Sequence, residues 1–215
     1  MLTDLFCGLF RSWPDNKFLE LDNLRLKVIT LLALSGLMRP SDLAPRGQVR
    51  EGKNLHPIIF SREHLFFRQD GSVQMTIWGT KTDYNRDGFT VVIQPASDPK
   101  VDPVSVLRCY LDITADFAAN VPGNPVLLTL KPPYRAISTP TVSDILNKAV
   151  SLVGLPKNSF SAKSFRAAGA TSALQRGQQP HRVRKLGRWR TQSVIDEHYD
   201  LSVPPTDITD DVLNI

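Results

Sequence analysis

The chain has 215 residues, of which 41% are hydrophobic, so it can build a substantial core as one large domain or two small ones. Its formal net charge of +5 and its pI near 9.4 favour a polyanionic partner such as nucleic acid. The composition argues against a disulfide framework, a structural zinc site, a membrane span and a secretory signal, because the two cysteines lie far apart and no long apolar run occurs. We therefore expect a soluble, intracellular protein that does not associate with a membrane.

The first predicted element is a buried helix over Leu24–Met38. This segment is rich in Leu at helical spacing, and Pro40 prevents its continuation. Ser41 or Asp42 can then cap the free backbone N–H groups of a new helix. Arg39 thus lies between the end of one helix and the start of the next, which is a rigid place to mount a guanidinium group.

A change of composition after residue 58 predicts a small sheet. β-Branched and aromatic residues gather in three runs, His64–Arg68, Ser72–Trp78 and Gly88–Gln94, with turn-forming residues between them. We expect these runs to form a three-stranded antiparallel sheet. Lys81 falls between the second and third strands, where a flexible ammonium group can reach into a DNA groove or donate a proton.

The other predicted elements are helices. They cover Val104–Ala119, Thr141–Val153, Ser164–Arg176 and roughly Gln179–Leu186, and Pro-rich or Gly-containing breaks separate them. The expected fold class is therefore mainly α with a small antiparallel three-stranded β-sheet (α+β). The residues after Tyr199 are acidic and contain two adjacent prolines, which predicts an extended tail.

The last third of the chain carries a basic segment that ends near an isolated tyrosine. Eight lysine and arginine residues lie between Ser161 and Tyr199, namely Lys163, Arg166, Arg176, Arg182, Arg184, Lys185, Arg188 and Arg190. A tyrosine hydroxyl can attack a phosphodiester when arginines neutralise the charge that builds on the phosphate and an acid protonates the departing oxygen. The pattern indicates a nucleophile beside a phosphate-binding cluster.

Five motifs in this order resemble the catalytic domain of the tyrosine recombinase (phage-integrase-like) family. They are SGLMRPSDL with Arg39 and Asp42, GTKT with Lys81, SAKSFRAAGAT with Lys163 and Arg166, LGRW with Trp189, and finally Tyr199. The resemblance extends from about Leu24 to Leu201. The Arg-Trp pair and the Arg-Ala-Ala helix are most similar to recombinases of eukaryotic mobile elements of the DIRS and Crypton kinds.

The resemblance implies a site-specific DNA recombinase or integrase that uses no metal and no cofactor. Tyr199 would attack the scissile phosphate and form a 3′-phosphotyrosine intermediate, which conserves the bond energy for rejoining. Arg39 and Arg166 would stabilise the charged transition state, and Lys81 would protonate the leaving 5′ oxygen.

Further residues receive supporting roles from the same resemblance. Trp189 would support the phosphate pocket, Asp42 would orient Arg39, and Lys163 would stand where the family most often has histidine. Four basic residues are expected to bind DNA, namely Arg184, Lys185, Arg188 and Arg190. Their contacts with phosphates would make DNA affinity fall steeply with salt.

The resemblance also implies an assembly. Residues 1–201 would form the catalytic domain, and residues 202–215 would be a tail exchanged between protomers. The family's usual N-terminal DNA-clamping domain would be absent. The partner would be double-stranded DNA, bound as two duplexes by a homotetramer. Without DNA a monomer is one alternative, and the oligomeric state there stays open. The expected location is the nucleus for a eukaryotic mobile element, and otherwise the cytoplasm or nucleoid.

Other interpretations stay open. A type IB topoisomerase-like enzyme uses related chemistry, and Lys163 in place of histidine favours a DNA-binding domain of the same fold that has lost catalysis. Taken singly, each motif residue also has an ordinary structural explanation: Arg39 as a helix cap, Lys81 as a solvated turn residue, Tyr199 as a packing residue. His181 and His198 have no partner ligand at useful spacing, which argues against a metal site.

Overall fold

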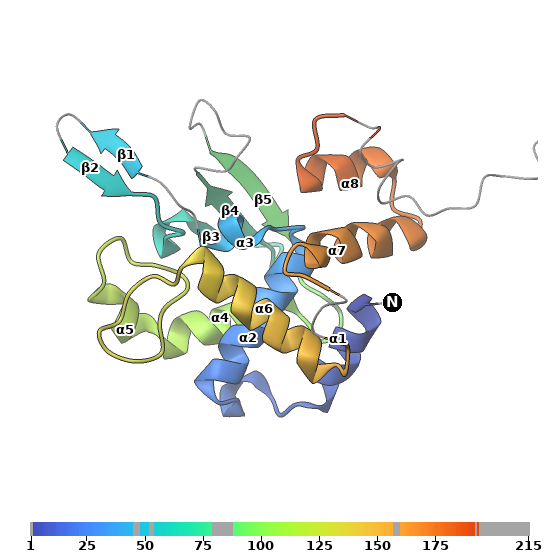
Figure 1. The fold of residues 1–215 in the computed structure, drawn as a ribbon, viewed down its shortest axis with the longest axis horizontal. Helices are drawn as coiled ribbons and strands as arrows, with labels where there is room; N and C mark the ends of the chain where they lie inside the picture. The colour runs from blue at the N-terminus through green and yellow to red at the C-terminus, as the bar shows by residue number, and fades with distance from the viewer. Residues whose placement is uncertain are drawn as a thin grey trace, which may run out of the picture.

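The computed structural model describes residues 2–44, 48–51, 54–78, 88–156, 160–191 and 193, and for 48–51 and 54–57 it describes the backbone alone. The helices are α1 (Leu2–Ser12), α2 (Leu21–Ser35), α3 (Pro40–Leu43), α4 (Pro103–Ile113), α5 (Ala115–Ala119), α6 (Thr139–Leu152), α7 (Ser164–Gln175) and α8 (Pro180–Gly187). The strands are β1 (Gln48–Glu51), β2 (Asn54–Pro57), β3 (Leu65–Phe67), β4 (Val73–Ile77) and β5 (Phe89–Ile93), and two 3-10 turns cover Asn16–Phe18 and Arg62–His64. The predicted fold class, mainly α with a three-stranded antiparallel sheet, is confirmed (Figure 1).

Helix α2 is the central element of the core. Its residues 24–34 are all buried, and it packs against α4, α6 and α7. A helix that is buried on all sides is stable only when other elements surround it. Gly169 of α7 has no side chain to separate the two backbones, and a Cβ there would collide with the carbonyl oxygen of Leu34. This close approach brings the start of α7 to the end of α2.

The predicted helix over Leu24–Met38 ends earlier than expected. Gly36 caps α2, with its backbone N–H donating to the Leu32 carbonyl at 3.0 Å, and Leu37 then adopts a left-handed backbone with φ +48°. A left-handed residue cannot continue a right-handed helix. The turn brings Arg39 to the N-cap position of α3, and the predicted helix start at Ser41 and Asp42 lies inside this short helix.

The three-stranded sheet has the order β3-β4-β5, and each predicted strand is present but one residue shorter at each end. Met75 in the middle strand pairs with Leu65 on one side and Val91 on the other. Side chains alternate along β4, with Val73, Met75 and Ile77 buried, so that one face of the sheet closes the core. The strands β4 and β5 are joined by residues 79–87, which carry Lys81 and lie outside the described residues.

Helix α1 was not expected from the sequence. It packs beside α7, where Phe6 stacks on Phe165 with ring centroids 5.1 Å apart and Arg176 pairs with Asp4 at 2.8 Å (Figure 1). The β1–β2 hairpin was not expected either. None of the helices in the described ranges is long and apolar enough to cross a membrane.

The predicted helix Val104–Ala119 is divided into α4 and α5 at Thr114. The Thr114 hydroxyl donates to the Tyr110 carbonyl at 2.6 Å and accepts a hydrogen bond from Arg62 at 2.5 Å. The Arg62 guanidinium also donates to three carbonyl oxygens, which belong to Leu111, Thr114 and Pro125. These contacts hold the helix end in a bent form that the local pattern did not indicate.

Candidate active site

An open pocket of about 750 Å³ lies beyond the C-terminal end of α2, where α3, α6, α7 and the segment after α8 meet. Its lining comprises Arg39, Pro40, Ser41, Thr139, Ser143, Asn147, Ser161, Ala162, Lys163, Arg166 and Trp189. Four of the predicted catalytic residues are therefore together in space, although three separate segments of the chain supply them. The other two, Lys81 and Tyr199, lie outside the described residues.

Arg39 is held at the pocket by its backbone. Its N–H donates to Asp42 Oδ2 at 2.8 Å, and Asp42 is fully buried beneath it. The carboxylate therefore fixes the first turn of α3. Within the described residues, no hydrogen bond or ion pair engages the Arg39 guanidinium, which leaves its five donors for a bound anion.

Arg166 is a buried arginine with only 4% of its surface exposed. Its Nη1 donates to the Leu37 carbonyl at 2.9 Å, its Nη2 donates to the Gly187 carbonyl, and its guanidinium lies 4.3 Å from the centre of a Trp189 ring. One side chain thus joins the ends of α2 and α8. Because these contacts fix the guanidinium before any ligand arrives, Arg166 can present a preorganised positive charge to the pocket.

Trp189 forms one wall of the pocket. Its six-membered ring lies directly over Gly187, where a Cβ would overlap the ring atoms. The Leu-Gly-Arg-Trp motif therefore requires glycine at Gly187, since any side chain would displace the tryptophan. The stacked guanidinium of Arg166 stabilises the arrangement through a cation–π interaction.

Lys163 is exposed at the edge of the pocket, directly before α7. The side chain of a lysine in this place can contact a phosphate as a mobile point charge. That Lys163 takes the place of the histidine of the tyrosine recombinase motif is a prediction from the sequence, and so is its chemical role.

A row of polar residues on α6 was not recognised in the sequence. Thr139, Ser143 and Asn147 all line the pocket. They occur at intervals of four residues, which places them on one face of a helix. This spacing was a signal available in the sequence. The Asn147 amide can donate hydrogen bonds to an anion in the pocket. The Thr139 and Ser143 hydroxyl groups already donate to the carbonyls of Ala44 and Thr139, at 2.7 and 3.1 Å.

The four predicted DNA-binding residues occupy different environments. Lys185 and Arg190 are exposed, and Arg184 is half-buried with its Nη1 donating to the Arg190 carbonyl at 3.2 Å. The Arg188 side chain is only 11% exposed and forms an ion pair with the buried Asp42. Burial lowers the pKa of Arg188, and the positive charge of nearby Arg39 acts in the same direction, whereas Asp42 opposes the shift.

The residues next to the end of β4 and the start of β5, on the two sides of residues 79–87, are tightly packed. Gly88 has φ +71°, and a Cβ there would lie 2.7 Å from Nε1 of Trp78. Trp78 also packs edge-on against His64, with ring centroids 4.1 Å apart. Phe89, the first residue of β5, lies under the Arg188 guanidinium at 3.9 Å. On the two sides of residues 79–87, Trp78 and Gly88 therefore lie close together, and Phe89 contacts Arg188.

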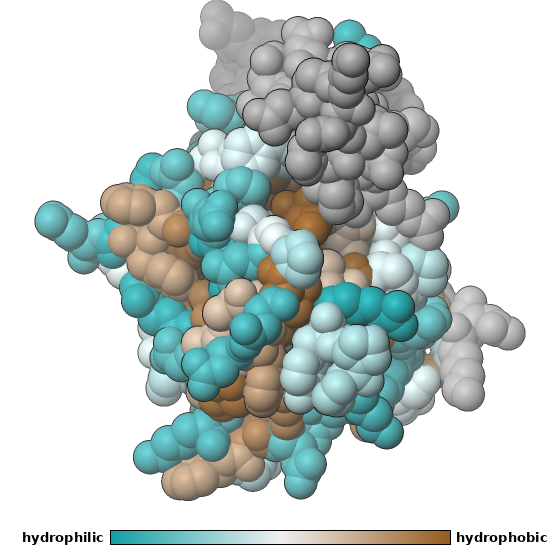
Figure 2. Space-filling model, turned by 90° about the vertical axis from the view of Figure 1, so that its left-hand side faces the viewer, coloured by the Kyte–Doolittle hydropathy of each residue, from teal (hydrophilic) through white to brown (hydrophobic). Residues whose placement is uncertain are grey.

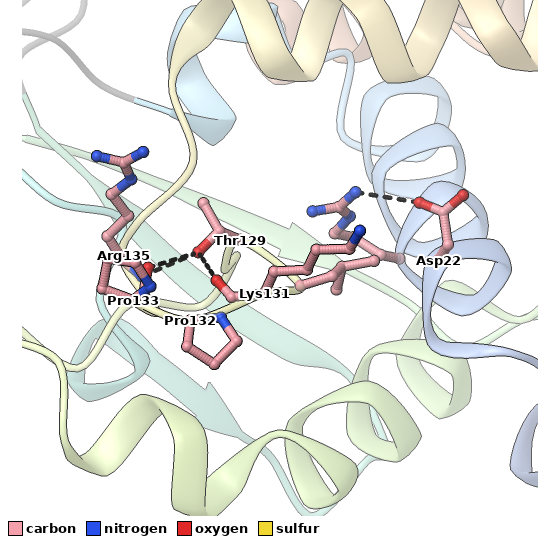
Figure 3. A pocket seen from close by; sticks show the side chains of 8 residues that line it. Asp22, Thr129, Lys131, Pro132, Pro133 and Arg135 are labelled. Atoms are coloured by element: carbon pink, nitrogen blue, oxygen red, sulfur yellow. Dashed lines mark hydrogen bonds and ion pairs between the residues drawn. The ribbon is translucent and has the colours of Figure 1, made fainter.

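A second open pocket, of about 550 Å³, lies at the opposite end of α2 (Figure 3). The length of this helix separates the two pockets by about 20 Å. Arg25 projects toward Asp22 and is bonded to it at 3.1 Å and to the Leu128 carbonyl at 2.9 Å, while Thr129 closes the adjacent loop through its hydroxyl group. Because Asp22 and the Leu128 carbonyl hold the Arg25 guanidinium, we assign this pocket a structural role.

The side of the molecule that carries α5 faces the viewer in Figure 2. In Figure 2, a narrow band of hydrophobic residues runs between hydrophilic ones on this face.

The small cavity lined by Ile58, Ile59 and Pro125 has a volume of about 30 Å³, which is room for about one water molecule. Among the described residues, no group of three or more His, Cys, Asp or Glu side chains is arranged to hold a metal ion.

The fold is similar to that of tyrosine recombinases of known structure. XerH site-specific recombinase, bound to palindromic difH substrate in a post-cleavage complex, matches with a TM-score of 0.64 and 12% identity, over 100% of this chain and 51% of XerH. XerA recombinase matches with a TM-score of 0.58 and 13% identity, over 84% of this chain and 53% of XerA. A lambda integrase(75-356) dimer bound to a COC' core site matches with a TM-score of 0.52 and 14% identity, over 91% of this chain and 61% of that chain.

These matches confirm the predicted tyrosine-recombinase catalytic-domain fold. The chain spans about half the length of the XerH and XerA chains that it matches. No protein-family model and no curated protein matches the sequence. The likeness to DIRS and Crypton recombinases stays a prediction.

Proposed function

We propose that this chain is the catalytic part of a site-specific DNA recombinase or integrase that cleaves and rejoins DNA through a 3′-phosphotyrosine. The observation that carries the proposal is the single pocket that gathers Arg39, Lys163, Arg166 and Trp189. The fixed guanidinium group of Arg166 and that of Arg39, beside a polar helix face, are suited to a phosphodiester, whose charge grows as a nucleophile attacks. The similar folds belong to recombinases, and XerH and lambda integrase are described in complexes with their DNA sites.

The proposed reaction is an exchange of one phosphodiester for another. The phenolic oxygen of Tyr199 gives its proton to water and forms a bond to phosphorus, while the bond from phosphorus to the 5′ oxygen breaks. Arg39 and Arg166 neutralise the nonbridging oxygens, and Lys81 gives a proton to the 5′ oxygen as it departs. The reverse reaction, with a 5′ hydroxyl from another strand, rejoins the DNA.

The proposal includes an assembly on double-stranded DNA. Four protomers would hold two duplexes, and the tail formed by residues 202–215 would pass between neighbouring protomers. A truncation after Leu201 should therefore reduce the mass of the DNA-bound oligomer in light scattering. An unchanged mass would contradict tail exchange. If the source is a eukaryotic mobile element, the protein would act in the nucleus.

The test is covalent attachment to DNA. Wild type and Tyr199→Phe are incubated with a pool of nicked random-sequence duplexes, because the nick lets the cut end diffuse away and traps the intermediate. We expect a band of protein linked to DNA on a denaturing gel for wild type alone. Salt-sensitive DNA binding without any covalent band would contradict the proposed reaction.

Two alternatives make different predictions in the same experiments. Lys163 in the place of histidine favours an inactive DNA-binding domain, which would bind DNA and never form the band. A type IB topoisomerase-like enzyme would form the band and relax supercoiled plasmid, and it would not exchange strands between two duplexes. Strand exchange between two labelled duplexes therefore separates a recombinase from a topoisomerase.

A further inference from the structure

Arg188 has an unusual backbone and an unusual environment for a residue in a basic segment. Its φ of +58° and ψ of +37° place it in the left-handed region, which is costly for a residue with a Cβ. Its side chain is 11% exposed and that of Asp42 is 1% exposed. Three exposed or half-buried neighbours, Arg184, Lys185 and Arg190, adopt no such conformation. A strained backbone that delivers a charge into the interior indicates a specific role for that charge.

The Arg188 side chain contacts two other segments that build the site. Its Nη2 donates to Asp42 Oδ2, the same oxygen that accepts the backbone N–H of Arg39. Its guanidinium also lies 3.9 Å from the ring centre of Phe89, the first residue of β5. Arg188 therefore connects the segment after α8 to α3 and to β5.

The neighbours of Arg188 in the sequence complete the connection. The Gly187 carbonyl accepts a hydrogen bond from Arg166, and the ring of Trp189 stacks on the Arg166 guanidinium. Residues 187–189 thus contact Arg166 on one side and Asp42 on the other. A displacement of Arg188 would move the Trp189 wall of the pocket and the support of Arg39 together.

We propose that the ion pair between Arg188 and Asp42 is a latch that positions Arg39 and Trp189 around the scissile phosphate. Arg188 is then a positioning residue, and it does not have the DNA-contacting role that the sequence suggested. Its Nε and Nη1 atoms are buried, so DNA phosphates cannot reach them without a rearrangement. The inference rests on the proposed recombinase function and adds a residue to its machinery.

The experiment compares Arg188→Met with Arg184→Gln, and it uses Arg135→Met, an exposed arginine at the distant second pocket, as a matched control. Three quantities are measured: the single-turnover rate of covalent adduct formation, the salt dependence of noncovalent DNA binding, and the emission of Trp189. The Trp189 signal is the difference between each protein and its Trp189→Phe counterpart.

For Arg188→Met, we expect adduct formation to slow by about 100-fold, because a misplaced catalytic group costs about that much. The salt dependence of DNA binding should be unchanged, and Trp189 emission should shift to the red as the ring becomes exposed. Arg184→Gln should instead lower the slope of log affinity against log salt by about 1. Arg135→Met should match wild type in all three measurements.

A double variant separates positioning from general stability. Removing one partner of a buried ion pair leaves the other charge unpaired, whereas replacing both partners often preserves the fold. In Asp42→Asn/Arg188→Met, the melting temperature should return toward that of wild type, while adduct formation stays slow. Recovery of both would mean that the pair only stabilises the fold, and it would overturn the proposal.

Two further results would also overturn it. The first is a lower salt slope in Arg188→Met with unchanged Trp189 emission, which would identify Arg188 as a DNA contact. The second is a wild-type rate in Arg188→Met. If wild type itself forms no adduct, the recombinase function fails, and Trp189 emission alone then decides whether the latch holds this wall of the pocket.

Discussion

Replacing Lys27 with Met should stabilise the protein at neutral pH. Lys27 lies in α2 with no exposed surface, where its Nζ donates to Asn16 Oδ1 at 2.9 Å and lies 5.7 Å from the centre of the Phe10 ring. Burial lowers the pKa of Lys27 from 10.5 to about 8, and the positive charge of Lys100 acts in the same direction. The ammonium group is therefore less stable in the folded protein than in the unfolded chain.

The size and the direction of the effect follow from these two pKa values. Between pH 8 and 10.5, the unfolded chain keeps a proton on Lys27 that the folded protein has released. Stability therefore rises with pH through this window, and the full cost of the buried charge is present below about pH 8. At about 1.4 kcal/mol per pKa unit, the cost is about 3 kcal/mol. Wild type should regain about 2 kcal/mol of this between pH 7 and about pH 9.5.

Urea denaturation at these two pH values measures the effect. Lys27→Met should exceed wild type by up to about 3 kcal/mol at pH 7, and the difference should narrow by about 2 kcal/mol at pH 9.5. The exposed Lys17→Met is the control and should stay within about 0.5 kcal/mol of wild type. A difference that does not change with pH would refute the reasoning, because the buried amine would then not titrate in this window.

Other substitutions test the packing around the site. Gly169→Ala should cost about 1–3 kcal/mol, because its Cβ would collide with the Leu34 carbonyl, and a neutral result in thermal melts would mean that α7 can move away from α2. Gly8 lies in α1, and no neighbouring atom is within 4 Å of a Cβ at this position. Gly8→Ala should therefore raise stability by about 0.5–1 kcal/mol, and a lower stability would contradict this open environment. Arg62→Lys should cost about 2 kcal/mol in urea denaturation, since an ammonium group cannot replace a guanidinium that reaches three carbonyl oxygens, and wild-type stability would show that these bonds contribute little.

The sequence predicted the elements whose own residues determine them. The strands β4 and β5 were found because β-branched and aromatic residues gather in them between turn-forming residues, and α7 was found within one residue of its bounds. Elements stabilised by distant partners were missed. Phe6 and Phe10 of α1 have helical spacing, but their burial depends on Phe165 in α7. The break at Thr114 depends on Arg62, which is 52 residues away.

The candidate site shows the same division between local and distant information. The order of motifs was enough to predict that Arg39, Lys163, Arg166 and Trp189 would meet, and the structure places them at one pocket. The sequence could not assign a separate role to each arginine, because every position of a basic run is equally polar.

Arg39 and Arg188 differ in how deeply their side chains are buried and in the groups that they contact. The Arg39 guanidinium lines the pocket while its backbone is held by Asp42, whereas Arg188 is turned inward by a left-handed backbone onto a carboxylate 146 residues away. A charge committed to a buried partner has little left to offer a phosphate, and its effect must act through the groups that it holds in place. Arg39 and Arg166 would then stabilise the negative charge of the phosphate, and Arg188 would determine the position of Arg39.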